Sequence, residues 1–408
     1  MVKAEPSNCQ PLEERGVRRF GFLAALAWLM AVAAISTDLY LPAIPSMALG
    51  LRETPVTIQL SVASYLAGFV LGQLGWGPLG DSIGRRMPML AGLALFVAAS
   101  AGSALSISGE AIIAWRLIQG IGASACAVLS RAVVRDLYSG DDAARVLSTL
   151  LAVMALSPLL GPLLGAAILD FAGWRAIFWT LAVAGIISAY VVLKQIPEDR
   201  IERTGTAISR YTKTYVEIAT DVRLLTPLAV GASFYAGLFA FLSASPQIFM
   251  VAFDFTPGAF ASLLAFGTFM VIISNLINAR VVRRVTHSRA LTVGALIGCV
   301  FGLGSIGATA LMPGDARVLI AALMGFMISG GFIVGNSVAG VLEFYPRAAA
   351  TASGLCGAVQ FLAGLAGSLA VSILFDGTAL PLSLVLGTAG ITMLIFTFLK
   401  RPGDEPVA

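Results

Sequence analysis

The sequence predicts an all-α, polytopic membrane protein with twelve transmembrane helices in two six-helix bundles and both termini in the cytoplasm. Three observations lead to this fold class: the apolar composition, the number of long apolar runs, and the placement of the basic residues. Of the 408 residues, 58% are hydrophobic and only 12% are charged, whereas soluble domains carry about 25% charged residues. With a mean hydropathy of +0.90, a soluble fold would expose large apolar patches. The composition therefore excludes a soluble enzyme, a disordered chain and a fibrous repeat.

A helix that crosses the hydrocarbon core needs about 20 apolar residues. Twelve such runs cover residues 20–47, 57–79, 87–106, 110–134, 146–169, 175–193, 224–250, 258–281, 290–312, 316–341, 348–374 and 380–399. The linkers are short except for 194–223, which is rich in charge. We therefore expect an N-terminal six-helix bundle over 1–193, a cytoplasmic central loop over 194–223 and a C-terminal six-helix bundle over 224–408.

The basic residues set the orientation, because cytoplasmic loops of membrane proteins carry the excess of lysine and arginine. With the N-terminus inside, 22 of the 26 basic residues fall in cytoplasmic segments, and only Arg52, Arg175 and Arg317 fall outside; Arg116 lies within a span. The net charge of +4 is thus mostly an orientation signal. We expect no nucleic-acid partner.

The residues that carry enzyme chemistry are scarce. Cys9, Cys126, Cys299 and Cys356 show no paired spacing, and His287, the single histidine, lies in a basic loop. These features argue against a metal site and a catalytic triad, and no Walker loop is present. We expect neither an enzyme nor a bound cofactor. An intramembrane enzyme or a transporter-like sensor is the alternative from another class.

A motif with unusual spacing joins the second and third runs. It places Gly77, Asp81, Gly84, Arg85 and Arg86 in one short turn. The glycines allow a tight backbone and close helix approach, and Asp81 can pair with Arg85 at the membrane face. We expect a cytoplasmic gating loop here. An ordinary basic loop would account for the two arginines but not for the full spacing.

This stretch resembles the signature loop of the major facilitator superfamily. Residues 116–123 resemble the membrane-embedded arginine motif of that superfamily, and residues 157–166 resemble the Gly-Pro motif of its antiporters. Residues 36–42 and 131–138 resemble the bicyclomycin/chloramphenicol-resistance (Bcr/CflA) branch of drug:proton antiporters. The likeness is densest in residues 36–175. In the second half, residues 278–284 lack the Gly–Asp–Gly pattern, so the gate there is poorly defined.

The resemblance implies a bacterial inner-membrane, multi-pass antiporter. It implies transport driven by the proton-motive force with no other cofactor, a small-molecule drug or metabolite and protons as partners, membrane lipid around the helices, and a monomer. The function that we predict is proton-coupled efflux of small amphiphilic drugs by alternating access. The alternative is a dedicated exporter of one endogenous metabolite, such as a siderophore, a purine or an amino-acid derivative.

Asp38 and Arg116 are the candidates for proton coupling. Asp38 lies nine residues from the outer end of its run, about 14 Å deep, and Arg116 lies about 9 Å below the same face. Ionisable groups at such depth are functional candidates by default, and the resemblance implies a coupling role for Arg116. We expect the two charges to pair. For Asp38 the alternative is a carboxylate at the outer helix end that reaches the interface. For Arg116 the alternatives are a purely structural ion pair or hydrogen bonds to backbone carbonyls.

Two further sets of residues complete the predicted site. Gly161, Pro162 and Gly165 combine small-residue spacing with a bend, which predicts a hinge between the two halves or plain helix packing. Arg135 and Asp136 are expected to join the gating loop in a cytoplasmic charge cluster that latches the outward-facing state, with a solvated basic face as the alternative.

The substrate cavity is the least defined part of the prediction. Tyr40, Tyr65 and Gln119 are polar groups within apolar runs, near Asp38 and Arg116 along the first half. Polar side chains in such runs usually face the bundle interior or a water-filled cavity. We therefore expect these three residues to line the cavity.

Overall fold

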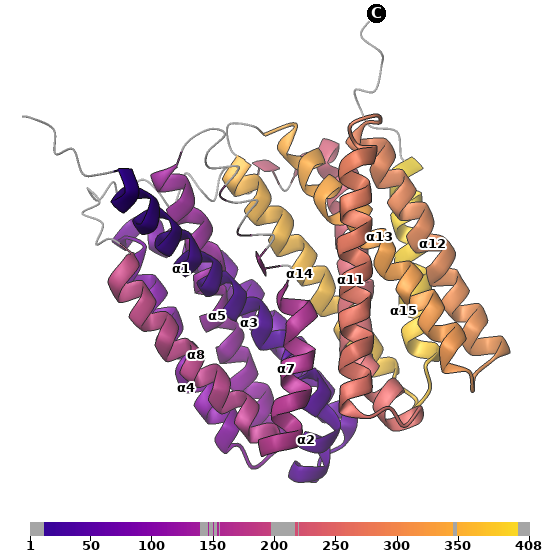
Figure 1. Cartoon of the computed structure of the whole chain (residues 1–408). Coiled ribbons are helices and arrows are strands. Elements are labelled where there is room, and N and C mark those ends of the chain that lie inside the picture. Colours follow the sequence, from indigo (N-terminus) through magenta and orange to yellow (C-terminus); the bar gives the residue numbers. More distant parts are fainter. Residues whose placement is uncertain are drawn as a thin grey trace, which may run out of the picture.

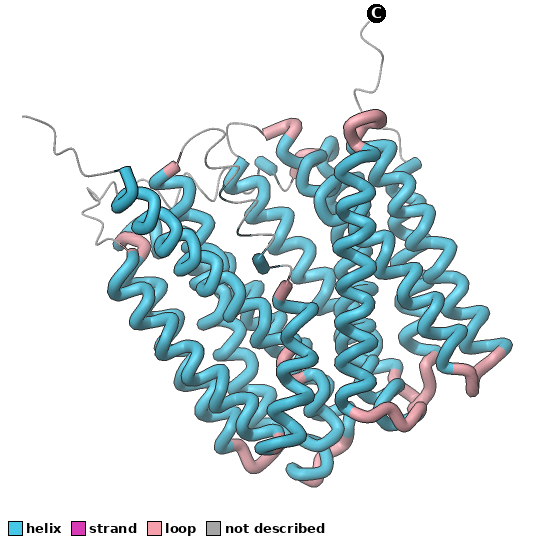
Figure 2. The backbone as a smooth tube through the Cα atoms, in the orientation of Figure 1, coloured by secondary structure: helices cyan, strands magenta, loops and turns pink. Residues whose placement is uncertain are grey.

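The structure is a computed structural model, and it describes residues 12–138, 146, 150, 153, 154, 156–196, 217, 218, 220–345 and 349–398. Within these ranges every regular element is a helix (Figures 1 and 2). The elements are α1 (Leu12–Asp38), η1 (Leu41–Ala43), α2 (Ile44–Leu51), α3 (Pro55–Ile83), α4 (Arg86–Leu105), α5 (Gly109–Leu137), α7 (Ser157–Ala172), α8 (Trp174–Gln195), η2 (Val222–Leu224), α10 (Leu225–Ser245), η3 (Pro246–Ala252), α11 (Pro257–Val281), α12 (His287–Leu311), α13 (Ala316–Leu342), α14 (Ala349–Leu374) and α15 (Leu380–Phe398).

Local signals explain where several helices begin. Thr54 and Thr256 each accept a hydrogen bond from the backbone N–H three residues further on, and a proline follows each of them. A capping hydroxyl satisfies a free N–H of the first turn, and proline at the first helical position has no N–H to lose. The same start at α3 and α11 repeats between the two halves of the chain.

The helices of each half pack mainly among themselves. In the first half α5 packs against α3 and α4, and α1 packs against α5, α7 and α8; in the second half α12 packs against α13 and α15, and α10 against α14. Two helix pairs make the largest contacts between the halves, α3 with α14 and α7 with α11 (Figure 1), and smaller contacts join α3 with α10, η1 with α11 and α2 with η3. The exact limits of the predicted domains stay a prediction, because residues 197–216 lie outside the described ranges.

The two ends of the helical body differ in charge. The end where α3 joins α4 and α11 joins α12 is called the basic end here; its described connections and helix ends carry Arg85, Arg86, Lys194, Arg223, Arg280, Arg283, Arg284 and Arg289. The opposite end carries Arg52, Arg175 and Arg317, as the sequence predicts. The orientation of these ends relative to the cytoplasm stays a prediction.

Eleven helices in the described ranges are long and apolar enough to cross a membrane, and Ser157–Ala172 is a shorter apolar helix. Two predicted runs differ from the structure. The run over 20–47 is broken: α1 ends at Asp38, and a 3₁₀ turn and the short α2 follow. Pro42 and Pro45 lack the N–H that a continuous helix needs. The helix expected to begin at residue 146 is described as continuous only from Ser157.

Candidate functional site

Asp38 lies at the break between α1 and η1. Its side chain is 6% exposed, and within the described part of the chain no ion pair or hydrogen bond reaches its carboxylate. Its Cβ lies against Gly161 of α7. A buried carboxylate without a partner is costly in its charged form. The helix break thus places a carboxyl group in an enclosed position without fixing its charge.

Arg116 of α5 is fully buried between two aromatic rings. Its guanidinium carbon lies 4.1 Å from the ring centroid of Tyr40 and 4.2 Å from that of Tyr65. Its Nη1 donates to the Ser36 carbonyl oxygen at 3.1 Å and to Gln119 Oε1 at 2.6 Å. Cation–π attraction and these two acceptors compensate part of the cost of burying the charge.

The pairing expected between Asp38 and Arg116 is therefore wrong for this conformation. No contact within 4 Å joins the carboxylate to the guanidinium, although both residues are described. The reason is geometric: Asp38 leaves α1 on the side of α7, whereas Arg116 is held on the side of α3 by Tyr65. The arrangement matches the alternative interpretation in which Arg116 binds a backbone carbonyl.

Tyr40, Tyr65 and Gln119 all contact Arg116. The Tyr65 hydroxyl donates to the Ala33 carbonyl oxygen at 2.9 Å, and the Tyr40 hydroxyl lies 3.2 Å from the Ser61 hydroxyl. Gln119 Nε2 donates to the Ser100 hydroxyl at 2.7 Å. These bonds fix the orientation of the three side chains around the guanidinium. Their predicted role as cavity lining stays a prediction.

The Gly-Pro helix α7 meets α1 through its glycines. A Cβ at Gly161 would lie 2.9 Å from the Asp38 Cβ, and a Cβ at Gly165 would collide with the Leu39 carbonyl oxygen. Pro162, inside the helix, is also buried. The two glycines of α7 therefore pack against α1 within the first half, and not at the interface of the halves where we expected them. The helix α7 also packs against α11 of the second half. The hinge role stays a prediction.

The predicted gating loop forms a compact charge cluster at the basic end. Arg85 pairs with Asp81 and donates from Nε to Asp136 Oδ2 at 2.8 Å. Burial works against the charge of Arg85, but the hydrogen bonds and charges of Asp136 and Asp81 outweigh it and raise the Arg85 pKa above its usual value. We call Arg85–Asp136 the first clasp, since it joins the start of α4 to the end of α5.

The other residues of this cluster have different places. Gly84 has φ +92°, which favours glycine at the turn. Arg86 Nη2 donates to the Leu193 carbonyl oxygen of α8 at 2.9 Å. A Cβ added at Gly77 would meet Val128 Cγ1 at 4.0 Å, so a larger side chain would fit there. The side chain of Arg135 lies outside the described residues. The described partners of Arg85 belong to the first half, so a latch between the halves stays a prediction.

Aromatic side chains that the sequence did not mark as special connect the halves. Phe361 of α14 lies 4.7 Å from Phe69 of α3, centroid to centroid, and 5.8 Å and 5.7 Å from Tyr235 and Phe239 of α10. Phe69 in turn lies 6.1 Å from Tyr65. The rings thus continue from the arginine site into the second half. No spacing rule separates such a phenylalanine from one that faces lipid.

The second half holds neutral polar pairs in its core. Asn336 of α13 donates to Asn278 Oδ1 of α11 at 2.9 Å and to the Phe332 carbonyl oxygen at 2.7 Å. Gln360 of α14 donates to the Ser337 hydroxyl at 3.2 Å. Asp38 and Arg116 are the only buried charged side chains in the described ranges. Among the described residues, the buried charge is therefore confined to the first half.

The chain matches known proteins over most of its length. A family model described as the Major Facilitator Superfamily covers residues 26–368. The bicyclomycin resistance protein homolog of Haemophilus influenzae is 29% identical over 93% of this chain and 96% of that protein. The chloramphenicol resistance protein of Pseudomonas aeruginosa is 31% identical over 91% of this chain and 88% of that protein.

The fold has a counterpart among solved structures. The crystal structure of a D-xylose-proton symporter covers 94% of this chain with a TM-score of 0.74 at 16% identity. The relationships confirm the predicted all-α major facilitator fold, the transporter rather than enzyme class, the multi-pass placement in a bacterial inner membrane, and the likeness to Bcr/CflA-type proteins. The cytoplasmic placement of both termini stays a prediction. The chain belongs to the Major Facilitator Superfamily.

Proposed function

We propose that this transporter exports small amphiphilic drugs across the inner membrane in exchange for protons, by alternating access. The relatives named for bicyclomycin and chloramphenicol resistance support the substrate class. The observation that carries the proton-coupling part is Asp38, a buried carboxyl group that lacks a counter-ion. Because no ion pair fixes its charge, its protonation can follow changes in its surroundings.

In the proposed cycle Asp38 is the proton carrier. When the site is open to the periplasm, the carboxyl group takes up a proton and the drug leaves. When the site opens to the cytoplasm, the proton leaves and the next drug molecule binds. Arg116 is held by Tyr40, Tyr65 and Gln119 and keeps its own charge through the cycle.

The proton-motive force is sufficient for this exchange. One proton that crosses 100 mV releases about 2.3 kcal/mol, and a pH difference of one unit adds about 1.4 kcal/mol. The combined free energy of about 3.7 kcal/mol would maintain a gradient of about 500-fold for a neutral solute. Since Asp38 is the one buried acid in the described residues, a neutral or zwitterionic drug fits better than a dication.

The test uses Asp38→Asn, which keeps the size of the side chain and removes its charge and its acidic proton. Asp170→Asn is the matched control, because Asp170 lies in α7 of the same half and is exposed. Everted vesicles with an acidic interior receive chloramphenicol or bicyclomycin, and a pH-sensitive dye reports proton efflux. We expect drug-induced proton release in the wild type and in Asp170→Asn, and none in Asp38→Asn.

A second experiment expresses the wild type and Asp38→Asn at matched levels in a strain that lacks its own exporters, and measures how susceptible the cells are to drugs. Protection against several unrelated compounds that Asp38→Asn abolishes would support the proposal. Concentrative export by Asp38→Asn would remove Asp38 from proton coupling. A wild type that folds but protects against no drug would contradict drug export, and the exported metabolites of the cells would then identify a dedicated substrate.

A further inference from the structure

A second acid–base contact lies at the basic end of the second half. His287 is the first residue of α12, and Glu343 directly follows the end of α13. His287 Nε2 lies 3.1 Å from Glu343 Oε2, with side-chain exposures of 23% and 54%. Nε2 is enclosed and has no aligned hydrogen bond among the described residues. Attraction between charges is therefore the interaction that this contact can offer.

The position of this contact corresponds to that of the first clasp. In the first half, Arg85 at the start of α4 meets Asp136 at the end of α5. In the second half, α12 and α13 occupy the places of α4 and α5 in the six-helix order. Both contacts thus join a base at the start of one helix to an acid at the end of the next. The two contacts are counterparts, separated by about half the chain.

The two bases differ in one property. Arginine is always charged in proteins, whereas histidine gains and loses its charge between about pH 5 and 8. The first clasp also has a second acid, Asp81, while the connection between α11 and α12 supplies Arg283 and Arg284 instead. The contact of the second half therefore depends on one titratable group and one carboxylate.

We propose that His287 and Glu343 form a pH-dependent second clasp, which is made when His287 is protonated and lost when His287 is neutral. His287 is then a positioning residue for the basic end of the second half. Acidification on that side of the membrane would hold α12 to α13 as the first clasp always holds α4 to α5. This inference depends on the contact itself and not on which compound is transported.

The described residues on the elements around His287 include other charged groups. On the chain around His287 they are Arg283, Arg284 and Arg289, and α15 carries no charged or titratable side chain over Leu380–Phe398.

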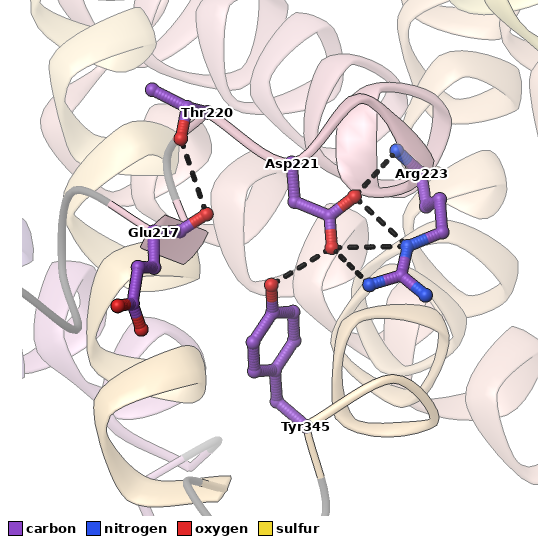
Figure 3. A network of polar contacts seen from close by, with 5 residues as sticks. All are labelled: Glu217, Thr220, Asp221, Arg223 and Tyr345. Carbon is purple, nitrogen blue, oxygen red and sulfur yellow. Dashed lines mark hydrogen bonds and ion pairs between the residues drawn. The ribbon is translucent and has the colours of Figure 1, made fainter.

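Just before α10, the charges of Asp221 and Arg223 already neutralise each other (Figure 3). Asp221 accepts hydrogen bonds from Arg223 and from the Tyr345 hydroxyl, the latter at 2.8 Å. The hydrogen bonds from Arg223, with that from Tyr345, lower the pKa of Asp221 to about 2. Asp221 therefore stays ionised from pH 5 to 8 and does not change its charge when His287 titrates.

The single histidine makes the test direct. The full chain, purified with a histidine-free tag and labelled with ¹⁵N-histidine, reports the titration of His287 alone by NMR. We expect the titration midpoint to lie about 0.2–0.7 pH units higher in the wild type than in Glu343→Gln. Glu217→Gln is the matched control, because it removes another exposed acid before α10 and should leave the midpoint in place. Equal midpoints in the wild type and Glu343→Gln would overturn the proposal.

A second measurement uses His287→Arg, which copies the base of the first clasp. Protonated His287 stabilises the folded protein at acidic pH, and this gain is lost as the pH rises. Glu343→Gln should therefore lower the melting temperature of the wild type by about 1 °C at pH 5.5 and not at pH 8. In the His287→Arg background the same substitution should have an equal effect at both pH values. A pH-independent effect in the wild type would contradict the titratable clasp.

Discussion

The two halves arrange six helices in the same order but put different chemistry at corresponding places. In the first half, α1, α3 and α5 meet around Asp38 and Arg116. In the second half, α11 and α13 meet through Asn278 and Asn336, which are neutral. A neutral amide pair satisfies its hydrogen bonds at any pH, whereas a buried carboxyl group responds to its surroundings. Among the described buried groups, the one that can respond to protons therefore lies in the first half, and the second half has a constant, neutral framework.

The largest expected effect comes from Arg116→Lys. Lysine keeps the charge but loses the planar group that fits between Tyr40 and Tyr65. We expect a loss of about 2–3 kcal/mol of stability and the loss of drug-induced proton release. The matched control is Arg175→Lys, because Arg175 stacks on Trp174 at the opposite end. Differential scanning calorimetry measures the stability of both variants, and the vesicle assay measures their proton release. Equal effects of Arg116→Lys and Arg175→Lys would contradict a special role of the buried arginine in the first half.

The second-largest expected effect comes from replacing one glycine by alanine in each of two helices that correspond between the halves. A Cβ at Gly165 of α7 would collide with the Leu39 carbonyl oxygen, and a Cβ at Gly367 of α14 with the Ala236 carbonyl oxygen. Each change to alanine should therefore cost about 1–3 kcal/mol, because a backbone must move. Only Gly165→Ala shifts the chain next to Asp38, so we expect it to reduce proton release further than its stability loss predicts.

The control for both glycines is Gly304→Ala in α12, where no atom lies within 4 Å of the added Cβ. This change should stabilise the helix by about 0.5–1 kcal/mol. Thermal unfolding and proton release are measured for all three variants. If Gly367→Ala impaired proton release as much as Gly165→Ala, the assignment of coupling to the first half would be wrong.

The smallest effect concerns the first clasp. Asp136 is partly exposed, so Asp136→Asn should cost only about 0.5 kcal/mol. The raised pKa of Arg85 means that its contribution to stability is complete below its usual pKa and is lost only at extreme alkaline pH. The cost of Asp136→Asn should therefore be the same at pH 5.5 and pH 8, unlike that of Glu343→Gln. Melting curves at the two pH values decide between these expectations.

Local patterns predicted the parts of the structure that neighbouring residues determine. The length of the apolar runs predicted the helices, and the short turn between the second and third runs predicted that Asp81 can pair with Arg85, which lies just beyond the end of α3 at Ile83. The contact of Arg85 with Asp136 was also expected, since both lie at the ends of runs on the same side.

The contacts that the sequence did not predict depend on which faces the helices present to one another. The sequence placed Asp38 and Arg116 at similar depth, but depth does not define direction, and the guanidinium of Arg116 lies over the rings of Tyr40 and Tyr65 instead. Glycine spacing in α7 predicted close packing but not its partner. The contact of His287 with Glu343 joins residues from two helices, which charge composition alone does not reveal.

The aromatic contact between the halves has a consequence for how such a protein changes under selection. Of the four rings that meet there, Phe361, Tyr235 and Phe239 come from the second half and only Phe69 from the first. Variation on α10 and α14 can reshape the shared surface while Asp38 and Arg116 keep their neighbours. A bacterium exposed to new antibiotics is expected to accumulate its range-altering mutations on those two helices.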